Sequence, residues 1–143
     1  MRFPAAPPAA CLAILGCVIA RAQPAALTVQ DAWVRATPGV DVAAAYLTLH
    51  NAGTQPVVVV GVRSPRASQA MIHETTVSNG RASMRPHEAL RIAGGETLRL
   101  APGGLHIMLR LNGPLAPGDE VPLQLLLSGG ASVAVTARVR DLH

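Results

Sequence analysis

The feature that most constrains this chain is a regular succession of short apolar segments, separated by turns that carry Gly, Pro or Asn. The 13 Gly and 12 Pro residues leave no stretch in which an amphipathic helix would persist. The nine segments expected to be strands are residues 27–36, 42–51, 56–63, 69–77, 81–86, 96–100, 105–111, 120–127 and 131–140. In the last of them apolar and polar residues alternate, which is typical of a strand with one buried face. This spacing predicts one all-β domain, a sandwich or a barrel.

The N-terminus has the layout of a secretory signal peptide, which we assign to residues 1–22. Arg2 is the only charge before residue 21, and residues 9–20 form an apolar run that is too short for a permanent membrane span. We predict cleavage after Ala22, which leaves a single domain of residues 23–143 in the periplasm. That domain has no apolar stretch long enough to be a transmembrane segment.

A second interpretation of the leader concerns Cys17. Residues 14–17 read Ile-Leu-Gly-Cys, which loosely matches a lipoprotein box, in which the cysteine is lipidated. The apolar run continues past Cys17, which fits soluble export better, and lipidation stays open as the alternative. Cys11 and Cys17 are the only cysteines, so removal of the leader leaves a domain without a disulfide, a thiolate ligand or a cysteine nucleophile.

Charge and composition exclude several classes of function. All 12 basic residues are arginine, and the mature chain keeps ten of them against eight acidic residues, a net charge of +2. The arginines are scattered, and one Trp and one Tyr offer no stacking platform, so we do not expect nucleic-acid binding. A blue-copper electron carrier and a thiol reductase both require a cysteine. We therefore expect a binding protein and not an enzyme.

Histidine and methionine stand out by their placement. His106 and Met108 are two residues apart in an expected strand, so their side chains point to the same face. His73 and Met84 flank a turn: they are diagonal neighbours on one face if the loop is Asn79-Gly80, and lie directly opposite each other if it starts one residue earlier. Thioether sulfur is soft and favours Cu(I), and imidazole also binds copper. The spacing does not establish whether the two pairs meet.

The four residues form the pattern His73-x10-Met84-x21-His106-x-Met108. Further stretches of note are DAWVRAT (31–37), AAAYLTL (43–49), MRP (84–86), PGGLHIML (102–109) and GDEVPL (118–123). Over residues 28–140, the pattern and these stretches resemble the periplasmic PCu(A)C copper chaperones.

The resemblance implies a fold, a metal and a partner. The fold would be a cupredoxin-like Greek-key β-sandwich or barrel. The resemblance implies a Cu(I) ion bound by His73, Met84, His106 and Met108. It also implies delivery of copper towards the copper centres of cytochrome c oxidase, with an oxidase copper subunit or another periplasmic copper chaperone as partner. The extra methionines that relatives often carry around the first hairpin are absent, which bears on a second site and not on these four residues.

Other readings remain beside this one. A copper-sequestering or tolerance protein without a dedicated oxidase partner would use the same site. Met71 is interpreted as core filler, although it shares strand parity with His73. His87 is a candidate substitute ligand because it is close to Met84, and His50 is interpreted as a surface residue at a turn.

Overall fold

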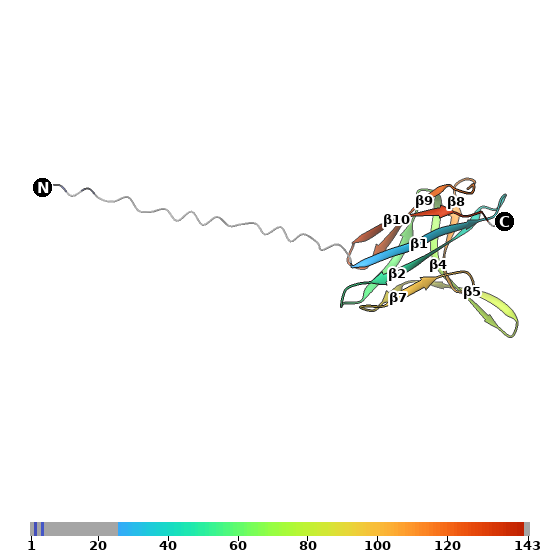
Figure 1. The fold of residues 1–143 in the computed structure, drawn as a ribbon, viewed down its shortest axis with the longest axis horizontal. Coiled ribbons are helices and arrows are strands. Elements are labelled where there is room, and N and C mark those ends of the chain that lie inside the picture. The colour runs from blue at the N-terminus through green and yellow to red at the C-terminus, as the bar shows by residue number, and fades with distance from the viewer. Residues whose placement is uncertain (1, 3, 5–25, 142–143) are drawn as a thin grey trace.

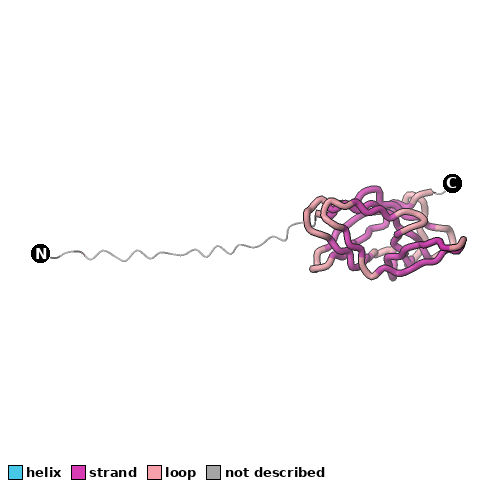
Figure 2. The backbone as a smooth tube through the Cα atoms, turned by 90° about the horizontal axis from the view of Figure 1, so that it is seen from below, coloured by secondary structure: helices cyan, strands magenta, loops and turns pink. Residues whose placement is uncertain are grey.

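The computed structural model describes residues 26–141, together with Arg2 and Pro4. Cys17, the expected cleavage site at Ala22, and His143 lie outside the described residues. Figure 1 shows a body built of strands, and Figure 2 shows strands joined by loops, with no helix in the described part. That part accordingly contains no helix long and apolar enough to cross a membrane.

Ten strands form the domain, and nine of them agree with the expected segments to within two residues. They are β1 (Leu27–Ala36), β2 (Val42–Asn51), β3 (Val57–Arg63), β4 (Ala67–Ser78), β5 (Arg81–His87), β6 (Leu90–Ile92), β7 (Thr97–Leu100), β8 (Leu105–Leu111), β9 (Glu120–Leu127) and β10 (Ser132–Val139). The sequence does not reveal β6, because three residues provide a single repeat of alternation. In the structure, buried Leu90 and Ile92 flank exposed Arg91.

The strands form one sheet in the order β5-β4-β8-β2-β1-β10-β9-β3-β6, and β7 also pairs with β2. β1 and β10 run parallel, and the other paired strands run antiparallel. The all-β prediction is confirmed. The order places β8 between β4 and β2, so that strands far apart in the sequence lie side by side.

The core is aliphatic and uses one face of each strand. On β2, Leu47 and Leu49 are each 1% exposed and pack in the core together with Leu109 of β8. Tyr46 alternates with Leu47 and therefore points to the opposite face, where its ring centroid lies 4.7 Å from that of Trp33. Burial of each leucine contributes about 1.5–3 kcal/mol. The sheet thus carries its core on one face and leaves the other face for polar and aromatic side chains.

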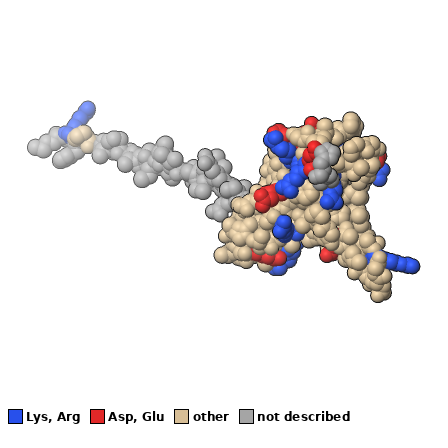
Figure 3. Space-filling model, turned by 45° about the vertical axis from the view of Figure 1, so that its right-hand side comes forward, with Lys and Arg blue, Asp and Glu red and all other residues tan. Residues whose placement is uncertain are grey.

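The β4–β5 hairpin has a turn that sets its register. Asn79 and Gly80 both have positive φ, 52° and 74°, as a type I′ loop requires. Ser78 pairs with Arg81, which confirms the first of the two registers expected from the sequence. The hairpin projects beyond the body of the domain (Figure 1), and Figure 3 shows basic atoms on this projecting arm.

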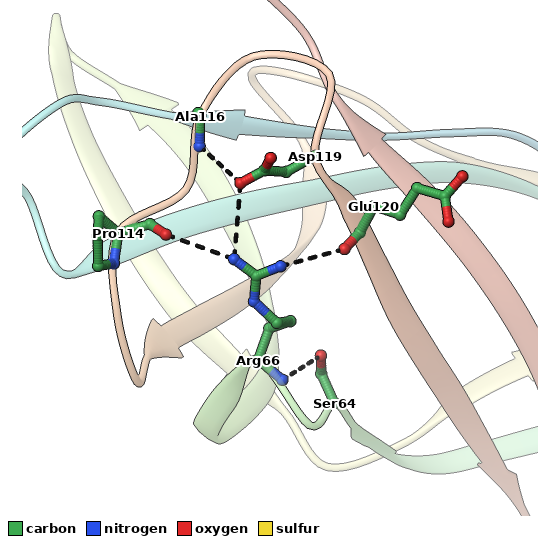
Figure 4. Close-up of polar contacts among 6 residues, drawn as sticks. All are labelled: Ser64, Arg66, Pro114, Ala116, Asp119 and Glu120. Carbon is green, nitrogen blue, oxygen red and sulfur yellow. Dashed lines mark hydrogen bonds and ion pairs between the residues drawn. The ribbon is translucent and has the colours of Figure 1, made fainter.

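Arg66, in the short connection before β4, holds that strand against the loop before β9 (Figure 4). Its guanidinium donates to the carbonyl oxygens of Glu120 and Pro114, each at 3.4 Å, and lies 3.6 Å from the carboxylate of Asp119. That carboxylate also accepts a hydrogen bond from the backbone N–H of Ala116 at 2.9 Å. These contacts fix the start of β4.

Candidate metal centre

Two imidazoles meet on the face of the sheet opposite the core. β4 and β8 pair with His73 directly opposite His106, and the two ring centroids lie 5.9 Å apart at 74°. Ile72 and Ile107, the sequence neighbours of the two histidines, pair in the same ladder and point into the core. The structure therefore joins the two histidines that sequence spacing alone could not bring together.

His106 is 5% exposed, and one of its ring nitrogens has a defined partner. Nδ1 lies 3.1 Å from the carbonyl oxygen of Gly104. A carbonyl oxygen only accepts, so Nδ1 carries the proton and donates it, and Nε2 of the neutral ring keeps its lone pair. On the β2 side the Tyr46 ring centroid lies 6.4 Å from that of His106. The hydrogen bond therefore orients the imidazole with Nε2 available for a metal.

His73 carries an unusual buried atom. Among the described residues, its Nδ1 is the one buried side-chain nitrogen or oxygen without a hydrogen-bond partner. Such an atom costs about 1–3 kcal/mol unless something binds it. Burial, and secondly the charge that His106 would carry, lower the pKa of His73 below its ordinary value of 6.5. The ring is therefore neutral at pH 7, the form that binds a metal.

The two methionines of the pattern reach this face from different strands. Met108 follows His106 by two residues on β8, shares its face, and is partly buried. Met84 of β5 lies opposite Thr75 of β4, which makes it a diagonal neighbour of His73. It is 61% exposed and lies on the projecting hairpin. The structure thus places all four residues of the pattern on one face of three adjacent strands.

The side chains on this face fit a soft metal ion. In residues 26–141, no three side chains of His, Cys, Asp and Glu gather into a group that could hold a metal. A metal held by the two imidazoles would therefore need ligands of another type, and the thioethers share their face. Calcium and magnesium prefer oxygen, and zinc prefers thiolate, imidazole and carboxylate. Imidazole and thioether together suit Cu(I), for which the unpartnered Nδ1 of His73 is a fitting donor.

Met71 lies on the same face of the sheet as these four residues, and its interpretation as a residue that fills the core is wrong. It pairs directly with Met108 across the β4–β8 ladder and lies on the face of His73. It is partly buried, and it is not among the residues that pack in the core, whereas Ile72 is. Its shared parity with His73 was the available signal, but only the pairing of β4 with β8 places it opposite Met108.

The other two histidines of residues 26–141, His87 and His50, have partners elsewhere. Nε2 of His87 lies 2.7 Å from a carboxylate oxygen of Glu74. Glu74 follows His73 on β4, and His87 of β5 pairs with Ile72, so both side chains belong to the face opposite that of His73. Nδ1 of His50 lies 2.9 Å from the hydroxyl of Thr97. The structure therefore does not bring His87 or His50 to the two paired imidazoles.

Comparison with known proteins identifies the family. Residues 27–139 match the family model described as "Putative lipoprotein LpqE-like". The chain belongs to the LpqE-like family. A protein of Leifsonia xyli subsp. xyli (strain CTCB07), named "Putative lipoprotein Lxx21020", is 40% identical to this LpqE-like protein over 115 residues, which cover 79% of this chain and 69% of that one.

Solved structures place this LpqE-like protein beside PCuAC domains. The solution structure of Cu(I)-DR1885 from Deinococcus radiodurans is 38% identical, with a TM-score of 0.67, and the match covers 83% of this chain and 81% of that one. The copper-bound PCuAC domain from PmoF2 has a TM-score of 0.69 at 20% identity, over 82% of this chain and 94% of that one, which is a likeness of fold. The resemblance to the PCu(A)C proteins and the cupredoxin-like fold are confirmed.

Proposed function

We propose that this LpqE-like protein is an exported Cu(I)-binding metallochaperone, and not an enzyme, with His73, Met84, His106 and Met108 as copper ligands. The observation that carries the proposal is the in-register pair of His73 and His106, with both methionines on the same face. The relation to Cu(I)-DR1885 at 38% identity supports Cu(I) as the metal.

The ligands suit copper binding near neutral pH. The lowered pKa of His73 favours its neutral ring, and the hydrogen bond of His106 to Gly104 leaves Nε2 with a lone pair. A thioether carries no proton. Copper therefore binds without displacing protons, in contrast to a thiolate site. The absence of cysteine after residue 17 also removes disulfide formation as a cause of inactivation in an oxidising compartment.

The exposure of the ligands suits handover to a partner. His106 is 5% exposed, whereas Met84 is 61% exposed and belongs to β5 of the projecting hairpin. A ligand of a recipient protein can therefore replace Met84 first, while the other ligands still hold the ion. We propose delivery towards the copper centres of cytochrome c oxidase, to a copper subunit or through another periplasmic copper chaperone.

Titration with Cu(I) against a chromophoric chelator, without oxygen, tests the site. We expect one tight equivalent, and a loss of affinity of at least about tenfold in His106→Ala and in Met84→Ala. His50→Ala is the matched control, because its ring contacts Thr97 of β7 and it lies beyond the residues of β2 that pair with β8. Unchanged Cu(I) affinity in His106→Ala would refute the site.

A transfer assay distinguishes delivery from the alternative of sequestration. The copper-loaded protein is mixed with the soluble copper domain of an oxidase subunit, and copper on each protein is measured after separation. A chaperone should pass copper on faster than free chelator removes it, because the recipient enters through Met84. Transfer no faster than spontaneous release would favour a sequestering protein.

The location is also open to direct measurement. We propose export, with cleavage after Ala22 and a periplasmic domain of residues 23–143; the family description and the Leifsonia relative name lipoproteins, which supports the alternative at Cys17. The intact mass of the protein from cell fractions separates the two. A soluble chain that starts at Gln23 supports cleavage after Ala22, and a membrane-bound chain that starts at an acylated Cys17 supports lipidation.

A further inference from the structure

Met71 and Met108 form a second cross-strand pair beside the two histidines. The β4–β8 ladder places Met71 opposite Met108, and the pair His73–His106 lies two residues further along the same two strands. All four side chains therefore share one face. Both methionines are partly buried. Two strands thus present two sulfurs and two imidazoles without any contribution from the hairpin strand β5.

Met71 lies on the strand next to that of His106, whereas Met84 lies one strand further away. β4 is the direct neighbour of β8, whereas β5 is separated from β8 by β4. Adjacent strands are about 4.8 Å apart, so Met84 is about 10 Å from β8 across the sheet and Met71 about 5 Å. Along the strands, Met71 and Met84 are each displaced by two residues from the histidine pair, in opposite directions.

We propose that Met71 is a further copper ligand, an inference that rests on the Cu(I) site proposed above. Met71, His73, His106 and Met108 form the holding set, on two strands in the body of the sheet. Met84, on the exposed hairpin, is the exchange ligand. When a recipient displaces Met84 from the ion, Met71 keeps the copper coordinated until the recipient has taken it.

The competing account is that Met71 only packs against Met108. The two accounts differ in the effect of Met71→Leu, which keeps an apolar side chain of similar volume and removes the sulfur. If Met71 is a ligand, Met84→Leu should retain one equivalent of Cu(I) with affinity reduced by about tenfold. Met71→Leu in that background should then reduce affinity by more than the product of the two single effects, because each sulfur compensates for loss of the other.

The measurement is Cu(I) competition with a chelator for the wild type, Met71→Leu, Met84→Leu and the double variant. Circular dichroism and the emission of Trp33, the single tryptophan, report whether each variant is folded. Equal affinities of Met84→Leu and the double variant would overturn the proposal. Failure of the wild type to bind Cu(I) would instead refute the proposed function, so the two failures are distinguishable.

The ε-methyl resonance of Met71 gives an independent readout. In protein labelled at the methionine methyl groups, the resonance absent from the Met71→Leu spectrum is that of Met71. In the Met84→Leu background it should shift upon addition of one equivalent of Cu(I), together with that of Met108. A shift of Met108 alone would overturn the assignment of Met71 as a ligand.

Discussion

Replacement of His73 by leucine should stabilise the copper-free protein while it abolishes the site. In the wild type, the buried Nδ1 of His73 has no hydrogen-bond partner, and its desolvation is not compensated. An apolar side chain at the same position removes that atom. The site residue is thus expected to cost stability in the absence of metal.

The magnitude follows from two opposing contributions. Removal of an unpartnered buried nitrogen gains about 1–3 kcal/mol of unfolding free energy. Loss of the edge contact with the ring of His106, whose centroid is 5.9 Å away, costs about 0.5–1.5 kcal/mol. We therefore expect copper-free His73→Leu to be more stable than the wild type by about 1 kcal/mol at pH 7.5.

The difference should grow as the pH falls. The folded-state pKa of His73 is lowered, first by burial and then by His106, whereas in the unfolded chain it takes its ordinary value of 6.5. Below that value the unfolded state binds more protons than the folded state, so this group costs the wild type stability as the pH falls through 6.5 towards the folded-state pKa. The leucine variant lacks this ionisable group, so its stability does not fall for this reason.

Urea denaturation of both proteins at about pH 7.5 and about pH 5.5, with and without Cu(I), measures these effects. Cu(I) at 100 times its dissociation constant should stabilise the wild type by about 2.7 kcal/mol and the variant by much less, so the order of stability inverts. His50→Leu is the matched control, because the ring of His50 has a partner in Thr97 and its removal should bring no gain. Copper-free His73→Leu that is less stable than the wild type would refute the reasoning.

Three further predictions concern the frame around the site. Asn51 is fully buried and donates to the carbonyl oxygens of Gln55 and Ile92 while it accepts from an N–H, so Asn51→Ala should lose about 3 kcal/mol in urea denaturation; a loss below about 1 kcal/mol would contradict this account. Asn79→Val places a β-branched residue at positive φ in the hairpin turn and should destabilise the protein by about 1–2 kcal/mol, whereas Asn79→Gly should be neutral or stabilising by the same assay. Arg66→Ala should lower the free energy of unfolding by less than about 1 kcal/mol, because its ion pair is partly exposed. The Cu(I) affinity of this variant should match that of the wild type, and a reduced affinity would mean that this contact couples to the site.

Local rules predicted the hairpin and the faces of its side chains. Asn79 and Gly80 are residues that accept positive φ at little cost, so the type I′ loop was one of two expected registers. Either register places His73 and Met84 on one face. The same period of two predicted that His106 and Met108 point together, and the structure agrees on both points.

The predictions from sequence were wrong or incomplete where a residue's environment depended on strands distant in the sequence. Judged from the sequence, Met71 has the properties of a core residue. Only its position opposite Met108 in the β4–β8 ladder reveals a different environment. β6 is too short for a periodic signal, and its strand status follows from its pairing with β3. His87 is close to Met84 in sequence but alternates to the opposite face, where Glu74 binds it.

By itself the sequence determined nine of the ten strands, their alternating faces, the hairpin, and the set of imidazoles and thioethers suited to soft-metal chemistry, because side-chain period and turn conformation depend on neighbours in the chain. Only the tertiary structure decided that β4 lies beside β8, that His73 faces His106, and that Met71 faces Met108. Strand order is set by burial of the aliphatic core across the whole sheet, a sum over contacts between distant segments that no local pattern contains.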